Sequence, residues 1–240
     1  MAKNSFFRFK QFTVHQDKCA MKVCTDACVL GAWANVAEAE RILDIGAGTG
    51  LLSLMVAQRN THAEIDAVEL DSDAFGQAAE NIVNSPFSER INVINSAIQD
   101  YKPSYQYDCI ITNPPFFQSD LLSPDLKKNN AHHATSLSFD ELLTSIDRLL
   151  TENGHFYILL PTDEAEVFLA KSLLAGWILV AKLLLHHDKN KKPFRQLMAF
   201  GRKQIAESQL FVEDLYIYDA HSSLHSSHFK ALMKDFYMIF

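Results

Sequence analysis

A glycine-rich segment between a strand pattern and a helix pattern most constrains how this chain folds. Residues 44–50 read Asp-Ile-Gly-Ala-Gly-Thr-Gly, with the apolar run Arg41–Gly46 leading in and helical periodicity following over Leu51–Gln58. Glycine adopts backbone conformations that other residues avoid, and it lets the backbone approach a ligand closely. The N–H groups of a following helix then face that ligand. The segment therefore predicts a ligand-binding turn at the carboxyl end of a strand in an open α/β sheet.

Strand and helix patterns keep alternating after this turn. Short apolar runs predict strands at Ala63–Leu70, Ile91–Asn95, Tyr107–Thr112 and His155–Pro161. Helical periodicity predicts helices at Ser72–Asn84, Phe139–Leu150 and Asp163–Ala175. This alternation indicates a mostly parallel twisted sheet with helices on both faces.

Two late apolar runs and the chain ends complete the predicted organisation. Trp177–Leu185 and Gln196–Phe200 have no helical pattern between them, so they predict an antiparallel hairpin at one edge of the sheet. Residues 1–40 form a preface, and residues 205–240 an aromatic tail too apolar to lie free in water. We expect both to pack on a single domain that spans residues 1–240.

The composition narrows the class of protein. No stretch approaches the roughly 20 apolar residues that span a bilayer. Four cysteines show no paired spacing and so predict neither a disulfide framework nor a metal site. We expect a cytoplasmic protein without a membrane segment.

The charge is unevenly distributed. The net charge is −7, yet residues 1–25 and 182–203 are locally basic. Such segments contact a phosphate backbone without making the whole protein basic, although solvated loops are the simpler alternative. The candidate phosphate-binding residues are Lys10, Lys22, Lys191, Lys192 and Arg195.

Glu69 ends the second predicted strand, in the sequence Ala-Val-Glu-Leu-Asp. A carboxylate at this position accepts two hydrogen bonds from ribose hydroxyls in α/β nucleotide-binding folds. It predicts a bound nucleoside without identifying which one. The neighbouring Asp71 is predicted to be a charge at a helix N-terminus.

The tetrapeptide Asn113-Pro114-Pro115-Phe116 directly follows the fourth predicted strand. The two prolines fix the backbone and remove two N–H donors. The side-chain carbonyl of Asn113 and the backbone carbonyl of Pro114 can then accept both N–H groups of one amine, while Phe116 stacks on a planar base or amide. The motif predicts a site that binds a planar amine and directs its lone pair toward an electrophile. Positioning and electrostatics carry such a reaction without a strong base.

The segment Phe117–Ser136 is long, polar and without periodicity. A loop of about 20 residues is uncommon in a compact domain and is typical of a lid or a binding loop. A loop without a role is an equal alternative.

These motifs resemble those of a known enzyme class. The D-x-G-x-G-x-G spacing of Asp44–Gly50 is similar to the first motif of class I methyltransferases, whereas dinucleotide folds use G-x-G-x-x-G. Asn-Pro-Pro-Phe after the fourth strand looks like the acceptor motif of enzymes that methylate amines of adenine, cytosine, guanine and glutamine. The resemblance implies a Rossmann-like class I methyltransferase fold with S-adenosyl-L-methionine as the cofactor.

Three further blocks narrow the resemblance over nearly the whole chain. They lie within residues 9–34, at Ser85–Val93 and at Lys234–Tyr237, and they are similar to those of the bacterial tRNA(Val) adenine-N(6)-methyltransferases. That family modifies the adenosine beside the anticodon, so the implied partner is a tRNA anticodon loop. In the family, Thr25 and Asp26 would lie near the methionine end of the cofactor.

Two positions depart from the family pattern. Cys24 stands where the family has glycine. Ala97 stands where an acidic residue often holds the adenine amine of the cofactor. Either a neighbour, Ser96 or Gln99, takes over this role, or stacking and backbone groups alone hold the adenine.

The motifs and the resemblance together define the expected site. The expected catalytic residues are Asn113, Pro114 and Phe116. The expected cofactor-binding residues are Thr25, Asp44, Gly46, Gly48, Gly50, Glu69, Ser96, Ala97 and Asn113. Three alternatives stay open: guanine N(2)-methylation of ribosomal RNA, glutamine methylation of a protein, and RNA binding without catalysis. A monomer is slightly favoured.

Overall fold

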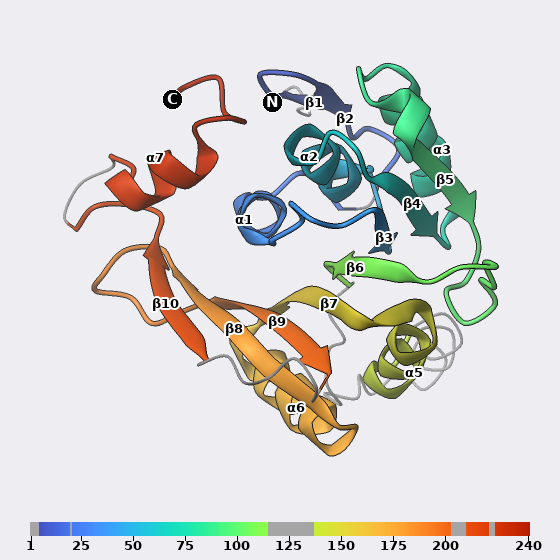
Figure 1. The fold of residues 1–240 in the computed structure, drawn as a ribbon. Coiled ribbons are helices and arrows are strands. Elements are labelled where there is room, and N and C mark those ends of the chain that lie inside the picture. Colours follow the sequence, from blue (N-terminus) through green and yellow to red (C-terminus); the bar gives the residue numbers. More distant parts are fainter. Residues whose placement is uncertain (1–4, 20, 115–136, 203–209, 221–223) are drawn as a thin grey trace, which may run out of the picture.

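The computed structural model describes residues 5–19, 21–114, 137–202, 210–220 and 224–240. These residues form an eight-stranded sheet, in the order β10-β8-β9-β7-β6-β3-β4-β5, and a two-stranded hairpin of β1 and β2 (Figure 1). The strands are β1 Phe6–Arg8, β2 Thr13–His15, β3 Arg41–Ile45, β4 Glu64–Glu69, β5 Ile91–Asn95, β6 Tyr107–Thr112, β7 Leu150–Pro161, β8 Trp177–His186, β9 Arg195–Arg202 and β10 Phe211–Tyr216. The helices are α1 Thr25–Trp33, α2 Leu51–Arg59, α3 Ser72–Val83, the 3-10 turn η1 Ser88–Arg90, α5 Phe139–Leu149, α6 Thr162–Leu174 and α7 Ser227–Met233.

Strands β5, β4, β3, β6 and β7 run parallel to one another. Helices cover both of their faces, so their sequences are almost continuously apolar. This confirms the predicted mostly parallel sheet. The prediction for β7 was too short, because the strand begins at Leu150 and not at His155. The intervening Thr-Glu-Asn-Gly reads as a turn, but pairing of Leu150 with Tyr107 holds this stretch extended across a register shift.

Helices α1, α2 and α3 lie on one face of the sheet, and α5 and α6 lie on the other (Figure 1). Two of these helices begin at residues whose side chains cap the helix N-terminus. Asp71 accepts the N–H groups of Asp73 and Ala74 at the start of α3, which confirms its predicted place at a helix N-terminus. Ser138 and Glu141 form a capping box at the start of α5. No helix of the described residues is long and apolar enough to cross a membrane.

Strands β8 and β9 form the predicted antiparallel hairpin, but the hairpin does not end the sheet. β9 lies between β7 and β8 and is antiparallel to both. β10 then pairs in parallel outside β8. β10 has no strand pattern in the sequence, because most of its side chains are exposed or half-exposed and only Leu215 is buried. A strand at the edge of a sheet therefore lacks the apolar pattern of the central ones.

The two terminal segments pack against each other and against α1. Phe9 and Tyr237 form an antiparallel bridge. Phe9, Phe229 and Phe236 are buried in the same cluster as the apolar side chains of α1 and α2. These contacts favour the predicted packing of both terminal segments on the sheet domain.

A buried carboxylate ties the segment between β5 and β6 to the sheet. Oδ2 of Asp66, in β4, accepts the hydroxyls of Tyr101 at 2.9 Å, Tyr105 at 2.8 Å and Tyr107 at 2.5 Å. The structure describes this whole segment, which forms no helix. Tyr101 and Tyr105 thus tie this connection to β4, whereas Tyr107 is the first residue of β6.

Replacing Asp66 with Ala is expected to lower the free energy of unfolding by about 3 kcal/mol, because three phenols lose their common acceptor. Asp100→Ala is the control, since Asp100 is exposed in the same segment, and it should change this free energy by less than about 0.5 kcal/mol. Urea unfolding followed by circular dichroism measures both. Equal stabilities of the two variants would contradict the role assigned to Asp66.

Candidate active site

The pairing of β3 with β6 brings the two predicted motifs together. Ile45 pairs with Thr112 in parallel register, and Oγ1 of Thr112 donates to the carbonyl of Ile45 at 2.8 Å. Gly46 and Asn113 are the next residues on the two strands. The glycine loop and the acceptor motif therefore leave the sheet side by side at its carboxyl edge, where α/β sheets bind their ligands.

The glycine loop adopts the backbone that its sequence predicts. Gly46, Gly48 and Gly50 have φ angles of 73°, 57° and 79°, which glycine adopts without strain. A Cβ atom at Gly46 or Gly48 would meet no atom of the described residues within 4 Å, so this part of the structure leaves space beside the loop. A Cβ atom at Gly50 would lie 3.3 Å from Cδ1 of Ile82, so glycine here also permits close packing against α3.

Glu69, the last residue of β4, holds the glycine loop from the neighbouring strand. Its Oε2 accepts the N–H of Gly48 at 2.8 Å, and its Oε1 accepts the N–H of Asp71 at 2.8 Å. The side chain is half-buried, and each carboxylate oxygen keeps a further lone pair. This arrangement suits the predicted hydrogen bonds to two ribose hydroxyls.

Asp44 lies fully buried beneath the loop. Its Oδ2 accepts the backbone N–H of Ser53 at 3.0 Å and its hydroxyl at 2.6 Å. Its Oδ1 has no partner among the residues that the structure describes. Burial raises the pKa of Asp44 to about 7, although the hydrogen bonds from Ser53 oppose this shift. The role of Ser53 was not predicted, since a serine in the first turn of a helix carries no specific sequence signal.

The acceptor motif presents a second unpaired oxygen. Oδ1 of Asn113 is shielded from solvent and has no partner in the described part of the chain, and Pro114 is buried. An unpaired buried acceptor costs about 1–3 kcal/mol, so its retention points to a ligand that donates to it. Phe116, predicted to stack on the substrate, and the predicted loop Phe117–Ser136 lie outside the described residues.

Thr25 begins α1 beside a buried ion pair. The next residue, Asp26, accepts from Nε of Arg195 at 2.8 Å, and the side chains of Asp26 and Arg195 are only 9% and 24% exposed. Arg195 begins β9, so the pair ties the N-terminus of α1 to the β8–β9 hairpin. Arg195, predicted as a phosphate contact, therefore has an internal partner. Burial raises the pKa of the adjacent Cys24 to about 12, so its thiol is neutral.

The neighbours of Ala97 differ in their availability to a ligand. The hydroxyl of Ser96 donates to the carbonyl of Ala97 at 2.9 Å, which leaves the lone pairs of Oγ as acceptors. The side chain of Ser96 is half-buried, whereas that of Gln99 is exposed. A half-buried acceptor is better shielded from competing water, which favours Ser96 over Gln99 as the acceptor that replaces the missing carboxylate at Ala97.

The predicted phosphate contacts fall into two groups. Lys22, Lys191 and Lys192 are exposed, and the last two lie in the β8–β9 connection. Lys10 instead donates from Nζ to the carbonyls of Lys234 and Phe240, which ties the N-terminal hairpin to the tail. Lys10, like Arg195, thus has an internal role that its sequence context does not reveal.

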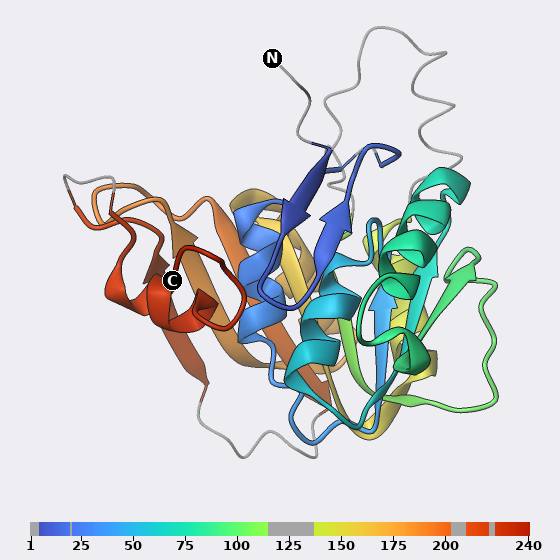
Figure 2. The ribbon, with the colours of Figure 1, turned by 90° about the horizontal axis from the view of Figure 1, so that it is seen from above.

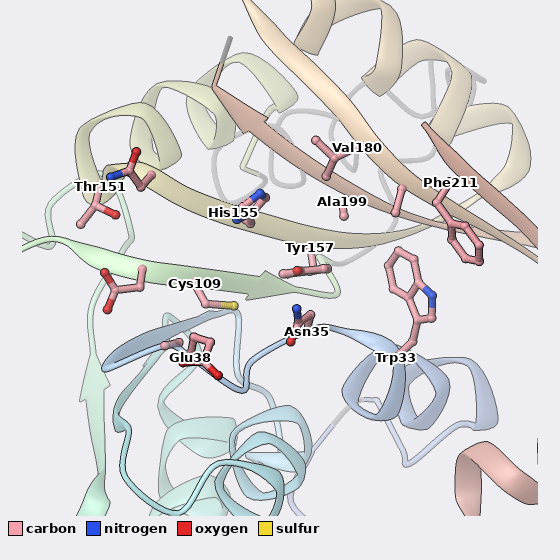
Figure 3. A pocket seen from close by; sticks show the side chains of 14 residues that line it. Trp33, Asn35, Glu38, Cys109, Thr151, His155, Tyr157, Val180, Ala199 and Phe211 are labelled. Atoms are coloured by element: carbon pink, nitrogen blue, oxygen red, sulfur yellow. The ribbon is translucent and has the colours of Figure 1, made fainter. Parts of the chain in front are cut away.

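A hollow of about 640 Å³ lies away from this edge (Figure 3). Asp108, Thr151 and Asn153 line it near the amino ends of β6 and β7, and Trp33 lines it from α1. None of the predicted site residues that the structure describes lines this hollow. The candidate active site is therefore the carboxyl edge, where the unpaired acceptors lie.

The fold and the site together define a class I methyltransferase. The family described as methyltransferase small domain matches residues 29–163. The solved structure of a predicted O-methyltransferase from Agrobacterium tumefaciens has the same fold, with a TM-score of 0.69 and 19% sequence identity, over 88% of this chain and 96% of that one.

Two curated relatives identify the family. The tRNA1(Val) (adenine(37)-N6)-methyltransferase of Dyadobacter fermentans is 60% identical over 240 residues, which cover 100% of both chains. Its namesake from Pedobacter heparinus is 40% identical over 238 residues, which cover 99% of this chain and 100% of the relative. The chain belongs to the family of tRNA1(Val) (adenine(37)-N6)-methyltransferases, which confirms the resemblance drawn from its motifs.

The raised pKa of Asp44 predicts a specific pH dependence. The carboxyl in the unfolded chain, with its ordinary pKa of 3.8, releases its proton at lower pH than the folded one, whose pKa is about 7. The contribution of this group to stability is therefore present at low pH and is lost as the pH rises toward about 7. Urea unfolding of the cofactor-free protein should show that Asp44→Asn gains stability relative to the parent between about pH 5 and about pH 8. A difference that does not change with pH would contradict the raised pKa.

Proposed function

We propose that this chain transfers a methyl group from S-adenosyl-L-methionine to the exocyclic N6 of adenosine 37 in tRNA1(Val). The observation that carries the chemistry is the buried Oδ1 of Asn113 beside the glycine loop, which has no hydrogen-bond partner among the residues that the structure describes. The tRNA and the base come from the curated relatives, which the chain matches along its whole length.

The described residues fit the cofactor. Open space above Gly46 and Gly48 admits a ligand close to the backbone, and the unpaired Oδ1 of Asp44 offers an acceptor below the loop. Glu69 would accept from the ribose hydroxyls, Ser96 from the adenine amine, and Thr25 would lie toward the methionine end. Within the described ranges, no group of three or more His, Cys, Asp or Glu side chains is placed to hold a metal ion. When bound, the cofactor would supply an electrophilic methyl group on a sulfonium sulfur, whose leaving group is a neutral thioether.

Asn113 and Pro114 position the substrate amine. The two N–H groups of an adenine amine donate to Oδ1 of Asn113 and to the carbonyl of Pro114. These bonds draw electron density toward the nitrogen and fix the direction of its lone pair. Catalysis then rests on orientation and preorganised dipoles, with Phe116 proposed to stack on the base.

The anticodon loop suits this site as a substrate. A base must leave its stack to reach an acceptor at a sheet edge, and the cost is smallest in a single-stranded loop. Proteins that recognise RNA by sequence mostly bind such splayed loop bases. Exposed Lys22, Lys191 and Lys192 would contact the phosphates.

The direct test offers labelled S-adenosyl-L-methionine with unmodified tRNA(Val), ribosomal RNA and a release-factor protein in parallel, followed by nucleoside digestion. Methyladenosine is expected in the tRNA alone. Label in ribosomal RNA or in protein alone would overturn the tRNA assignment and keep the amine chemistry. No label in any of the three would indicate RNA binding without catalysis.

Asn113→Ala should lower the turnover number at least about 100-fold, because the amine loses a preorganised acceptor. Binding of S-adenosyl-L-methionine, measured by calorimetry, should survive, because the glycine loop and Glu69 still hold the cofactor in this variant. The control is Asn84→Ala at the exposed C-terminus of α3, which should leave both quantities near their parent values. Near-normal turnover by Asn113→Ala would show that the acceptor site has been wrongly assigned.

A further inference from the structure

The β8–β9 connection reaches the edge of the sheet that carries the acceptor motif. β8 runs parallel to β7, since both strands are antiparallel to β9, and β7 is parallel to β6. The end of β8 therefore faces the same way as Asn113. Figure 2 shows this connection, in orange, on the same side of the molecule as the blue β1–β2 hairpin. Three strand steps separate β8 from β6, or about 14 Å at about 4.8 Å per step.

His187 begins this connection and Phe194 ends it, and the rings of the two residues stack face to face. Their ring centroids lie 4.2 Å apart and their planes differ by 7°. Phe194 is half-buried and packs against the core, whereas His187 is exposed. The guanidinium carbon of Arg195 lies 5.5 Å from the centre of the Phe194 ring. Phe194 is thus the inner layer of the stack, and His187 is its solvent-exposed outer layer.

Backbone hydrogen bonds hold both residues of the stack in place. The N–H of Phe194 donates to the carbonyl of Leu185 at 2.9 Å, and the N–H of Tyr218 donates to the carbonyl of His187 at 2.8 Å. Behind the stack, Arg195 is held by the buried carboxylate of Asp26. A platform that is already ordered loses little freedom when a ligand stacks on it.

Cationic side chains lie in the same turn as the stack. Lys189, Lys191 and Lys192 are exposed in the turn, which is shaped by a hydrogen bond from the N–H of Lys191 to the carbonyl of Asp188. An aromatic ring beside several positive charges is the combination that binds single-stranded nucleic acid, because bases stack on the ring while phosphates meet the cations.

We propose that His187, supported by Phe194, stacks on a base of the RNA loop that neighbours the methylated nucleotide, while Lys191 and Lys192 contact its phosphates. The inference rests on the proposed function and adds to it a substrate-binding residue outside the cofactor and acceptor motifs. The imidazole stacks on any base, so the contact contributes affinity and positioning more than sequence selectivity.

The test compares binding of a fluorescent anticodon stem-loop by the parent protein, His187→Ala and His187→Phe. His187→Ala should raise Kd about tenfold, the effect of losing one base–aromatic contact, and raise KM without changing the turnover number. His187→Phe should keep the parent Kd, because it retains a ring. His62→Ala, at an exposed histidine before β4, is the matched control. RNA carrying 2-aminopurine at each loop position in turn should reveal one position whose fluorescence rises only in His187→Ala.

The salt dependence of Kd distinguishes the stacking contact of His187 from the phosphate contacts of the lysines. Lys191→Glu with Lys192→Glu should reduce the slope of log Kd against log salt concentration by about 1 or more, whereas His187→Ala should leave this slope unchanged. An unchanged Kd in His187→Ala, with tRNA still methylated by the parent, overturns the stacking role alone. A lower melting temperature or weaker cofactor binding in His187→Ala also overturns it, in favour of a structural role. If the parent neither binds nor methylates the tRNA, the proposed function fails and this inference fails with it.

Discussion

The register between β3 and β6 is the constraint on which the site depends. Side-chain direction alternates along a strand, so a shift of one residue would turn every side chain to the opposite face. The pairing of Ile45 with Thr112, reinforced by the hydroxyl of Thr112, prevents that shift. It sets the exit of the glycine loop beside Asn113, and the loop in turn fixes Gly48 against Glu69. Three separate segments thus form one site because the neighbouring strands β6, β3 and β4 end at the same level.

The site also contains buried hydrogen-bond acceptors that the described part of the fold leaves without donors. Oδ1 of Asp44 and Oδ1 of Asn113 are buried without partners in the described part of the chain, although each such atom costs about 1–3 kcal/mol. Both lie at the carboxyl edge, under and beside the glycine loop. The same edge shows open space above Gly46 and Gly48. Stability is therefore lower here than an apolar replacement would give, which supports the proposal that a bound ligand donates to these atoms.

A feature could be predicted from the sequence where the residues that cause it are neighbours in the chain. The parallel strands, the glycine loop and the cap at Asp71 depend on such neighbouring residues and were predicted. β10 was missed because an exposed edge strand has no apolar run. The partners of Lys10 and Arg195 were missed for another reason. Lys10 bonds to Phe240, 230 residues away, and Arg195 to Asp26, 169 residues away, so only the folded chain reveals that these basic residues have internal partners.

The ion pair between Asp26 and Arg195 connects two parts of the molecule that the sequence keeps apart. On one side, Asp26 follows Thr25 at the N-terminus of α1, the end expected near the cofactor. On the other side, Arg195 lies over Phe194, which supports the exposed ring of His187. A buried pair is costly to break, because removing one partner leaves an unpaired charge in a place that excludes water. The β8–β9 hairpin is therefore held in a fixed position relative to α1, so that an RNA loop bound at the hairpin and a cofactor bound near α1 would share one rigid frame.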